Sequence, residues 1–141
     1  MSDDIYVLRP VGRVESPLQL RQDAPKQGDE GAPDAWLVFD PAVERALRDL
    51  RPNDEVLVLT WLDRADRNVL AVHPRGDTER PETGVFATRS PDRPNPIGLH
   101  RVEIIEISDI DGPRIKVRNL EALDGTPVLD IKPTLGRVDE R

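Results

Sequence analysis

Apolar and polar residues alternate in short runs along much of this 141-residue chain, a pattern typical of β-strands that bury one face. The clearest run is residues 55–62, Glu-Val-Leu-Val-Leu-Thr-Trp-Leu, which is dense in β-forming residues. Similar runs predict strands over residues 5–14, 35–40, 68–73, 84–89, 99–108, 114–121 and 128–132. Pro10 interrupts the first run, so that segment is predicted to be an edge or bulged strand.

One segment has the period of a helix instead. Asp40 can cap the free amides of a first turn that Pro41 opens. The apolar residues Val43, Ala46, Leu47 and Leu50 then follow at helical spacing. The whole pattern predicts a mainly β chain: about seven mostly antiparallel strands, with one short helix, in a small closed or nearly closed β-barrel. A sandwich is the alternative, and we expect residues 1–141 to form a single domain.

The composition agrees with a loop-rich β protein. Fourteen prolines and nine glycines stand against only five aromatic residues. No apolar run approaches the ~20 residues that a membrane-spanning helix needs. The first residues lack the basic and apolar regions of a signal peptide, so we expect a cytoplasmic protein without a membrane anchor. The absence of cysteine excludes disulfides and thiol chemistry.

The charge balance limits the range of partners. A net charge of −7 argues against a general nucleic-acid binder, which normally has a basic face. Between Arg89 and Arg101, however, three arginines accompany the single acid Asp92. Such a patch could contact RNA phosphates, with weak and salt-dependent binding.

The most informative segment is residues 84–99, where a short apolar run leads into Arg-Ser-Pro-Asp-Arg-Pro-Asn-Pro-Ile-Gly. We call residues 89–98 the Pro-rich turn, because its three prolines restrict its backbone. Arg89 and Arg93 place two permanent cations on this stiff segment, as expected of a loop that binds an anionic or carboxylate-bearing ligand. An ordinary solvated loop is the alternative.

Several classes of enzyme lack their motifs here. The chain has neither a Gly-x-Gly-x-x-Gly dinucleotide motif nor a Gly-Lys-Ser/Thr phosphate loop. The only histidines, His73 and His100, have no partner at ligand spacing. Each is better explained as a packed or surface residue than as a zinc ligand, and we predict no metal site.

Other candidates lie at predicted strand ends and turns. Leu62 and Asp63 follow the strongest strand, and Asn119, Leu120 and Glu121 end another, where side chains could reach a ligand. The long polar segment 16–34 is either a lid or a mobile surface loop. Asp124-Gly125 is typical of a tight hairpin turn.

The Pro-rich turn, together with Leu-Asp-Gly-Thr-Pro-Val-Leu-Asp-Ile-Lys-Pro at residues 123–133, resembles the TsaA/TrmO-like family. A weaker likeness begins at residues 11–17. Characterised members of that family are S-adenosylmethionine-dependent tRNA methyltransferases built on a small β-barrel. The resemblance implies a homodimer that methylates N6 of threonylcarbamoyladenosine beside the tRNA anticodon.

The resemblance also implies site residues. Those expected to bind S-adenosylmethionine are Gln27, Gly28, Asp29, Leu62, Asp63, Arg89, Leu99, Arg118, Asn119, Leu120 and Glu121. Those expected to bind the substrate are Arg93, Asn95, Thr126 and Lys132. We predict Asp124 as a catalytic acid near the methyl acceptor.

Three positions depart from the family pattern. Leu62-Asp63 stands where a Phe-His-like pair is usual, Asp92 where a bulky residue is usual, and Thr134 where Tyr is common. Two alternatives therefore accompany tRNA methylation. One is a methyltransferase that acts on a small metabolite or another nucleoside. The other is a non-catalytic barrel that binds S-adenosylmethionine.

Overall fold

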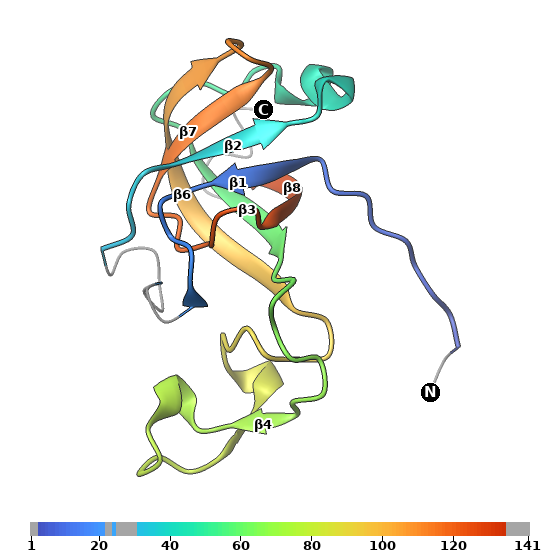
Figure 1. Ribbon diagram of the computed structural model, residues 1–141, viewed down its shortest axis with the longest axis vertical. Helices are drawn as coiled ribbons and strands as arrows, with labels where there is room; N and C mark the ends of the chain where they lie inside the picture. The colour runs from blue at the N-terminus through green and yellow to red at the C-terminus, as the bar shows by residue number, and fades with distance from the viewer. Residues whose placement is uncertain (1–2, 22–23, 25–30, 135–141) are drawn as a thin grey trace.

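Six antiparallel strands close into a ring in this computed structural model, which describes residues 3–21, 24 and 31–134 (Figure 1). The strands of the ring are β1 (Gly12–Glu15), β2 (Ala35–Phe39), β3 (Glu55–Trp61), β6 (Ile97–Ser108), β7 (Arg114–Arg118) and β8 (Pro127–Pro133). Their order around the ring is β1-β2-β7-β6-β3-β8. The predicted mainly β class and closed barrel are confirmed; the ring contains six strands, where the sequence predicted about seven.

Alternation along the strands explains the core. Every second residue of β2 and β3 is buried, as the period of a pleated strand requires. The inward positions carry branched apolar side chains, and Leu37, Val58 and Ile104 are fully buried. These residues form one cluster inside the barrel, so each strand is held in register by the burial of its inner face.

The predicted helix is a short 3₁₀ helix, η3 (Pro41–Leu47). Its cap is as expected, since an Asp40 carboxylate oxygen accepts a hydrogen bond from the Ala42 N–H at 2.9 Å. Val43, Leu47 and Leu50 pack against the core, but Ala46 is exposed. The helix is short, and its end is closed by an i→i+3 bond from Arg48 N–H to the Arg45 carbonyl, as is typical of 3₁₀ pieces.

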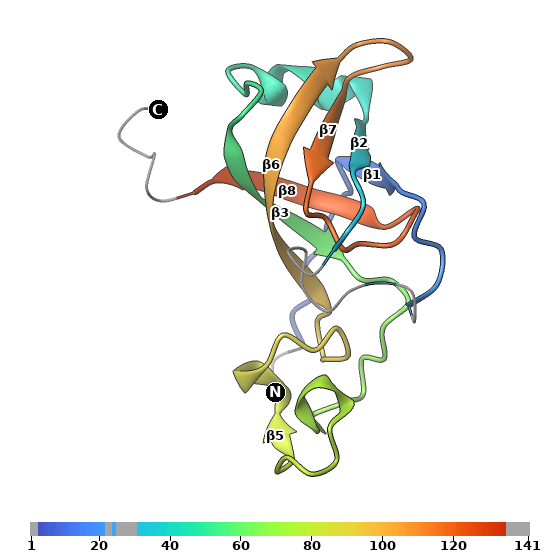
Figure 2. The same ribbon diagram turned by 90° about the vertical axis from the view of Figure 1, so that its left-hand side faces the viewer.

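Residues 62–96 form a lobe below the barrel, which we call the β4–β5 lobe (Figures 1 and 2). It contains the two-stranded sheet β4 (Ala71–Val72) and β5 (Thr83–Gly84). Two 3₁₀ turns complete it, η4 (Pro74–Gly76) and η5 (Val85–Ala87). The strand predicted over residues 84–89 is therefore wrong beyond Gly84, because the chain turns there and Val85 C=O accepts the Thr88 N–H.

Two further predictions need correction. The strand predicted over residues 5–14 begins only at Gly12, and residues 3–11 carry no regular element. Asp124-Gly125 does form a turn, with Gly125 at a φ of 82°, but not a hairpin. β8 pairs with β1 and β3, whereas β7 pairs with β2 and β6. The turn thus moves the chain across the barrel instead of reversing it onto its neighbour.

Among the described residues, no helix has the length and apolar character needed to cross a membrane.

Candidate functional site

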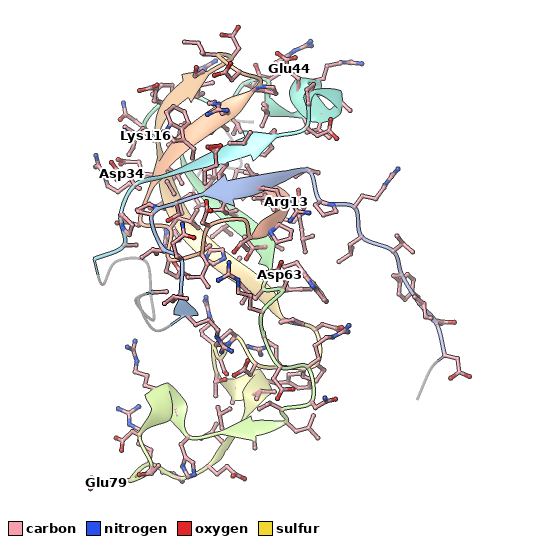
Figure 3. All side chains as sticks on the ribbon, in the orientation of Figure 1. Arg13, Asp34, Glu44, Asp63, Glu79 and Lys116 are labelled. Atoms are coloured by element: carbon pink, nitrogen blue, oxygen red, sulfur yellow. The ribbon has the colours of Figure 1, made fainter. Side chains whose placement is uncertain are left out.

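One open end of the barrel brings together several of the predicted site residues. β3 and β7 end there and β6 and β8 begin there, since neighbouring strands are antiparallel. The Leu62 N–H donates to the Pro96 carbonyl at 2.8 Å, so the β4–β5 lobe starts and finishes at this same end. Figure 3 shows Asp63 at this point, between the barrel and the lobe. Segments far apart in the sequence thereby meet at one mouth.

A cavity of about 350 Å³ lies at this end, and we call it the mouth cavity. Its volume is in the range of small-molecule sites. The predicted residues that line it are Leu62, Asp63, Arg89, Glu121 and Thr126. Arg21, Ala24, Arg64, Ala65, Pro91, His100, Ala122 and Leu123 complete the lining. The cavity thus combines apolar surface with guanidinium and carboxylate groups.

A buried polar chain connects the core to this cavity. His100 is only 4% exposed and lies on the inner face of β6, next to fully buried Thr60 of β3. Thr60 Oγ1 lies 2.7 Å from His100 Nε2, and His100 Nδ1 lies 2.6 Å from Glu121 Oε1. A Glu121 carboxylate can only accept, so Nδ1 is the donor to it, and in the neutral ring Nε2 accepts from the Thr60 hydroxyl. His100 therefore fixes the direction of the Glu121 carboxylate.

Gly98 makes room for this chain. It lies opposite Thr60 in the β3–β6 register. A Cβ at this position would lie 2.6 Å from His100 Nε2 and would also meet Thr60 Oγ1. The glycine of Pro-Ile-Gly is thus required by a buried hydrogen bond beside it.

The two arginines of the Pro-rich turn have different roles. Arg93 donates from Nη1 to the carbonyls of Thr88 and Ser90, both at 3.0 Å, and from Nη2 to that of Val85 at 2.8 Å. Its guanidinium therefore holds the turn together, and its contact with substrate stays a prediction. Arg89 is exposed and lines the mouth cavity. Within the described part of the chain, its guanidinium has no hydrogen-bond or ion-pair partner.

Asp92 ties three segments together at the cavity rim. Its two carboxylate oxygens each accept from Arg21 Nη2 at 3.1 Å. Its Oδ1 also accepts the Asp66 N–H at 2.8 Å. This residue, which departs from the family pattern, joins the N-terminal loop and the start of the lobe to the Pro-rich turn.

A neighbouring depression, which we call the strand hollow, contains three more of the predicted residues, Leu99, Arg118 and Asn119. It shares Arg89, His100 and Glu121 with the mouth cavity. Asn119 has a φ of 72°, a left-handed conformation that asparagine tolerates. Leu120 is fully buried in the core, so its side chain does not reach either depression.

The remaining predicted residues lie elsewhere. Asn95 accepts from Arg67 Nη2 at 2.8 Å, and Lys132 pairs with Asp130 at 3.3 Å on the exposed side of β8. The Asp124 Oδ1 accepts the Ser16 N–H at 3.0 Å, and Asp124 is not among the residues that line the mouth cavity. Gln27, Gly28 and Asp29 lie outside the described residues.

Sequence reasoning missed Arg21, Arg64 and the functional position of His100. Arg64 donates to the Gln19 carbonyl and, at 3.3 Å, to the Asp124 carbonyl, contacts between distant loops that no local motif marks. The position of His100 in the sequence could have indicated a buried hydrogen bond. It occupies an inward position of a strand, where a polar side chain needs a buried partner.

Comparison with known proteins gives the same family that the motifs suggested. A family model, the tRNA-methyltransferase O N-terminal domain, matches residues 13–140. A probable S-adenosyl-L-methionine-binding protein of Methanothermobacter thermautotrophicus is 45% identical over 139 residues, covering 99% of this chain and 97% of its own. An S-adenosyl-L-methionine-binding protein of Archaeoglobus fulgidus is 46% identical over 134 residues, covering 94% and 92%.

The crystal structure of TrmO from Pseudomonas aeruginosa superposes with a TM-score of 0.73 at 27% identity. It covers 98% of this chain, but this chain spans only 60% of that one. The sequence match, the shared fold and the two motifs agree, and the chain belongs to the tRNA-methyltransferase O N-terminal domain family.

Proposed function

We propose that this protein is an S-adenosylmethionine-dependent methyltransferase. The observation that carries the proposal is the mouth cavity. There an Arg89 guanidinium that has no partner among the described residues and the oriented Glu121 carboxylate share one lining with apolar side chains. S-adenosylmethionine presents a carboxylate, an ammonium, ribose hydroxyls and an apolar base face. Each of these has a matching group in the cavity lining.

The residues divide by chemistry. Arg89 would bind the carboxylate, because a guanidinium matches its planar geometry. Glu121 and Asp63 would accept hydrogen bonds from the ammonium or the ribose hydroxyls, while Leu62 and Leu123 would contact the adenine. The bound donor supplies an electrophilic methyl group on a sulfonium. The protein's own task is then to position the two reactants and exclude water.

We propose tRNA as the acceptor, with N6 of threonylcarbamoyladenosine beside the anticodon as the methylated atom. Membership of the family supports this substrate. Asp124 stays our prediction for the carboxylate near the acceptor; Thr126, on the cavity lining, and Asn95 stay predictions for substrate contact.

We also propose a homodimer. The outer faces of β3 and β6 carry apolar side chains where a barrel exposed to water would carry polar ones. Ile97 and Leu99 are 42% and 41% exposed. Ile97 and Trp61 also line one hollow with Ile5 and Tyr6, which are 87% and 84% exposed. An apolar surface of this kind, rimmed by charge, is typical of a protein interface.

Calorimetric titration with S-adenosylmethionine tests the donor site. We expect Arg89→Ala to weaken binding by about 1.5–3 kcal/mol, or roughly 10- to 150-fold, because a charge-assisted hydrogen bond is lost. Arg45→Ala is the matched control, since Arg45 lies on η3, away from the mouth cavity. Equal affinities for the two variants would show that Arg89 does not bind the donor.

Mass spectrometry of nucleosides tests the acceptor. After incubation of the protein with tRNA and S-adenosylmethionine, threonylcarbamoyladenosine should gain one methyl group. Donor binding without methylation of any tRNA nucleoside would favour a small-molecule acceptor or a non-catalytic binding barrel.

A further inference from the structure

A second depression adjoins the mouth cavity on the side of the β4–β5 lobe, and we call it the lobe hollow. Its volume is about 650 Å³, and it shares Arg21, Arg89 and Pro91 with the mouth cavity. A molecule in the lobe hollow would therefore reach the cavity directly past Arg89. Such an adjoining space is what a methyl acceptor needs, because it must approach the donor without displacing it.

The lining of the lobe hollow is cationic. Among the described residues that line it, four are arginines, Arg21, Arg75, Arg80 and Arg89, and one is a carboxylate, Asp92. Arg80 also lies 3.7 Å from Asp77, and both side chains are about half exposed, so this pair is strongly screened. Even with Asp77 included, guanidinium groups outnumber carboxylates among these described residues, in a chain whose net charge is −7.

The strand hollow also adjoins the mouth cavity, and the charges of its lining are balanced. Arg101 pairs with Glu55 at 2.7 Å, and Arg118 pairs with Glu103 at 3.1 Å. Its remaining charged residues are Arg89 and Glu121, so guanidinium and carboxylate groups are equal in number. An anionic molecule is therefore drawn to the lobe hollow and gains no net attraction from the strand hollow.

The arginines of the lobe stand on a hydrogen-bonded frame. His73 links the segment that contains Arg75 to the segment that contains Arg80. The His73 Nδ1 lies 2.9 Å from the Arg80 carbonyl, and the His73 carbonyl accepts a hydrogen bond from the Gly76 N–H at 2.9 Å. Arg75 sits in the left-handed region at a φ of 55°, within the short turn η4. The turn and the His73 hydrogen bonds keep both Arg75 and Arg80 in the lining of the lobe hollow.

We propose that the lobe hollow binds phosphate groups of a polynucleotide acceptor, with Arg75 and Arg80 as phosphate-binding residues and Arg89 at the junction with the donor. This inference rests on the proposed function, because it assigns a surface to the acceptor of that reaction. It also explains how an acidic chain can bind RNA. Affinity depends on the local potential where phosphates lie, and the acidic groups outside the hollow limit non-specific binding.

Binding of a synthetic RNA hairpin with an adenosine-containing loop tests this inference. The measurement is the dissociation constant as a function of salt concentration, for Arg75→Ala/Arg80→Ala and for the control Arg45→Ala/Arg48→Ala. The control removes the same charge from η3 and its cap, at the opposite end of the molecule from the lobe, as the positions of Glu44 and Glu79 show in Figure 3. Circular dichroism verifies that both variants fold.

We expect the lobe variant to bind the hairpin at least 10-fold more weakly and the control to bind like the wild type. The slope of log K against log salt should fall by about 1.4 in the lobe variant, since each lost single-strand phosphate contact removes about 0.7. Its affinity for S-adenosylmethionine should stay unchanged.

Equal RNA affinity and equal slopes for the two double variants would overturn the inference. A second result would also overturn it: adenosine monophosphate binds the wild type as tightly as the hairpin does, and its affinity falls by the same factor in the lobe variant. The ligand of the hollow would then be a free nucleotide. If the wild type binds S-adenosylmethionine but no RNA, this inference and the proposed tRNA acceptor fail, while the donor site stands. If it binds no S-adenosylmethionine, the proposed function fails.

Discussion

Replacement of Gly98 by alanine tests the buried polar chain. The added Cβ would lie 2.6 Å from His100 Nε2, shorter than the 3.0 Å below which real Cβ contacts are essentially never seen, and would also meet Thr60 Oγ1. Backbone, Thr60 or His100 must then move, which costs about 1–3 kcal/mol in a packed interior. Loss of the 2.7 Å bond between buried groups costs about 1–3 kcal/mol more. We therefore expect Gly98→Ala to lower the free energy of unfolding by about 2–6 kcal/mol.

Urea denaturation followed by circular dichroism measures this change. With an m value of about 2 kcal/mol/M, the midpoint should fall by about 1–3 M. Gly84→Ala is the control, because a Cβ there meets no atom within 4 Å and its φ is −59°. That variant should be neutral or up to about 1 kcal/mol more stable. Displacement of His100 also frees the Glu121 carboxylate, so Gly98→Ala should weaken donor binding as well.

The reasoning fails if Gly98→Ala unfolds within about 0.5 kcal/mol of the wild type, the range of an ordinary surface substitution. A double-mutant cycle gives a second check. Thr60→Ala removes the hydroxyl that the new Cβ would meet, so the two substitutions together should cost at least about 1 kcal/mol less than their sum. Additive effects would show that Thr60 is not the group in conflict.

The other predictions concern Asp124 and the outer face. Asp124→Ala should lower the free energy of unfolding by about 1 kcal/mol because the Ser16 N–H loses its acceptor, whereas Asp124→Asn keeps an oxygen there and should be as stable as the wild type in urea. If Asp124 acts near the acceptor, Asp124→Asn should still lower kcat for methyl transfer; an unchanged kcat refutes the catalytic role. Ile97→Lys places a charge on the exposed apolar face of β6 and should convert a dimer to a monomer in sedimentation equilibrium. A wild type that sediments as a monomer at the same concentration contradicts the dimer.

Strand positions could be predicted wherever inward and outward residues alternate. Residues 55–62 and 99–108 closely match β3 and β6, because burial of one face determines both the pattern and the register. The same rule failed at residues 84–89. That apolar run has no strand to pair with beyond Gly84, and the Arg93 guanidinium instead binds the carbonyls of a turn. Whether such an apolar run becomes a strand or a turn therefore depends on contacts with residues outside the run.

The candidate site divides in the same way. Arg89, Leu62, Asp63 and Glu121 could be assigned because motifs and strand ends place them, and all four line one cavity. Arg93 stands on the same turn as Arg89, and nothing in the sequence shows that its guanidinium binds the carbonyls of that turn. Thr60 and His100 could each be recognised as inward polar residues, but their connection to Glu121 depends on how β6 meets the segment after β7.

The β4–β5 lobe is inserted between two strands that are themselves paired. β3 and β6 are in register from Glu55↔Glu103 to Trp61↔Ile97, so residues 62–96 are in effect one long hairpin loop. The entropic cost of such a loop grows only slowly with its length, and the ring of six strands closes without it. Under the proposed function, the part of this loop between Asp63 and Arg89 could therefore be exchanged or lengthened to change the acceptor surface, while Asp63 and Arg89 near its ends and Glu121 outside it keep the donor site. On that assignment the donor site and the acceptor surface share one loop, with donor residues near its two ends and the acceptor surface between them.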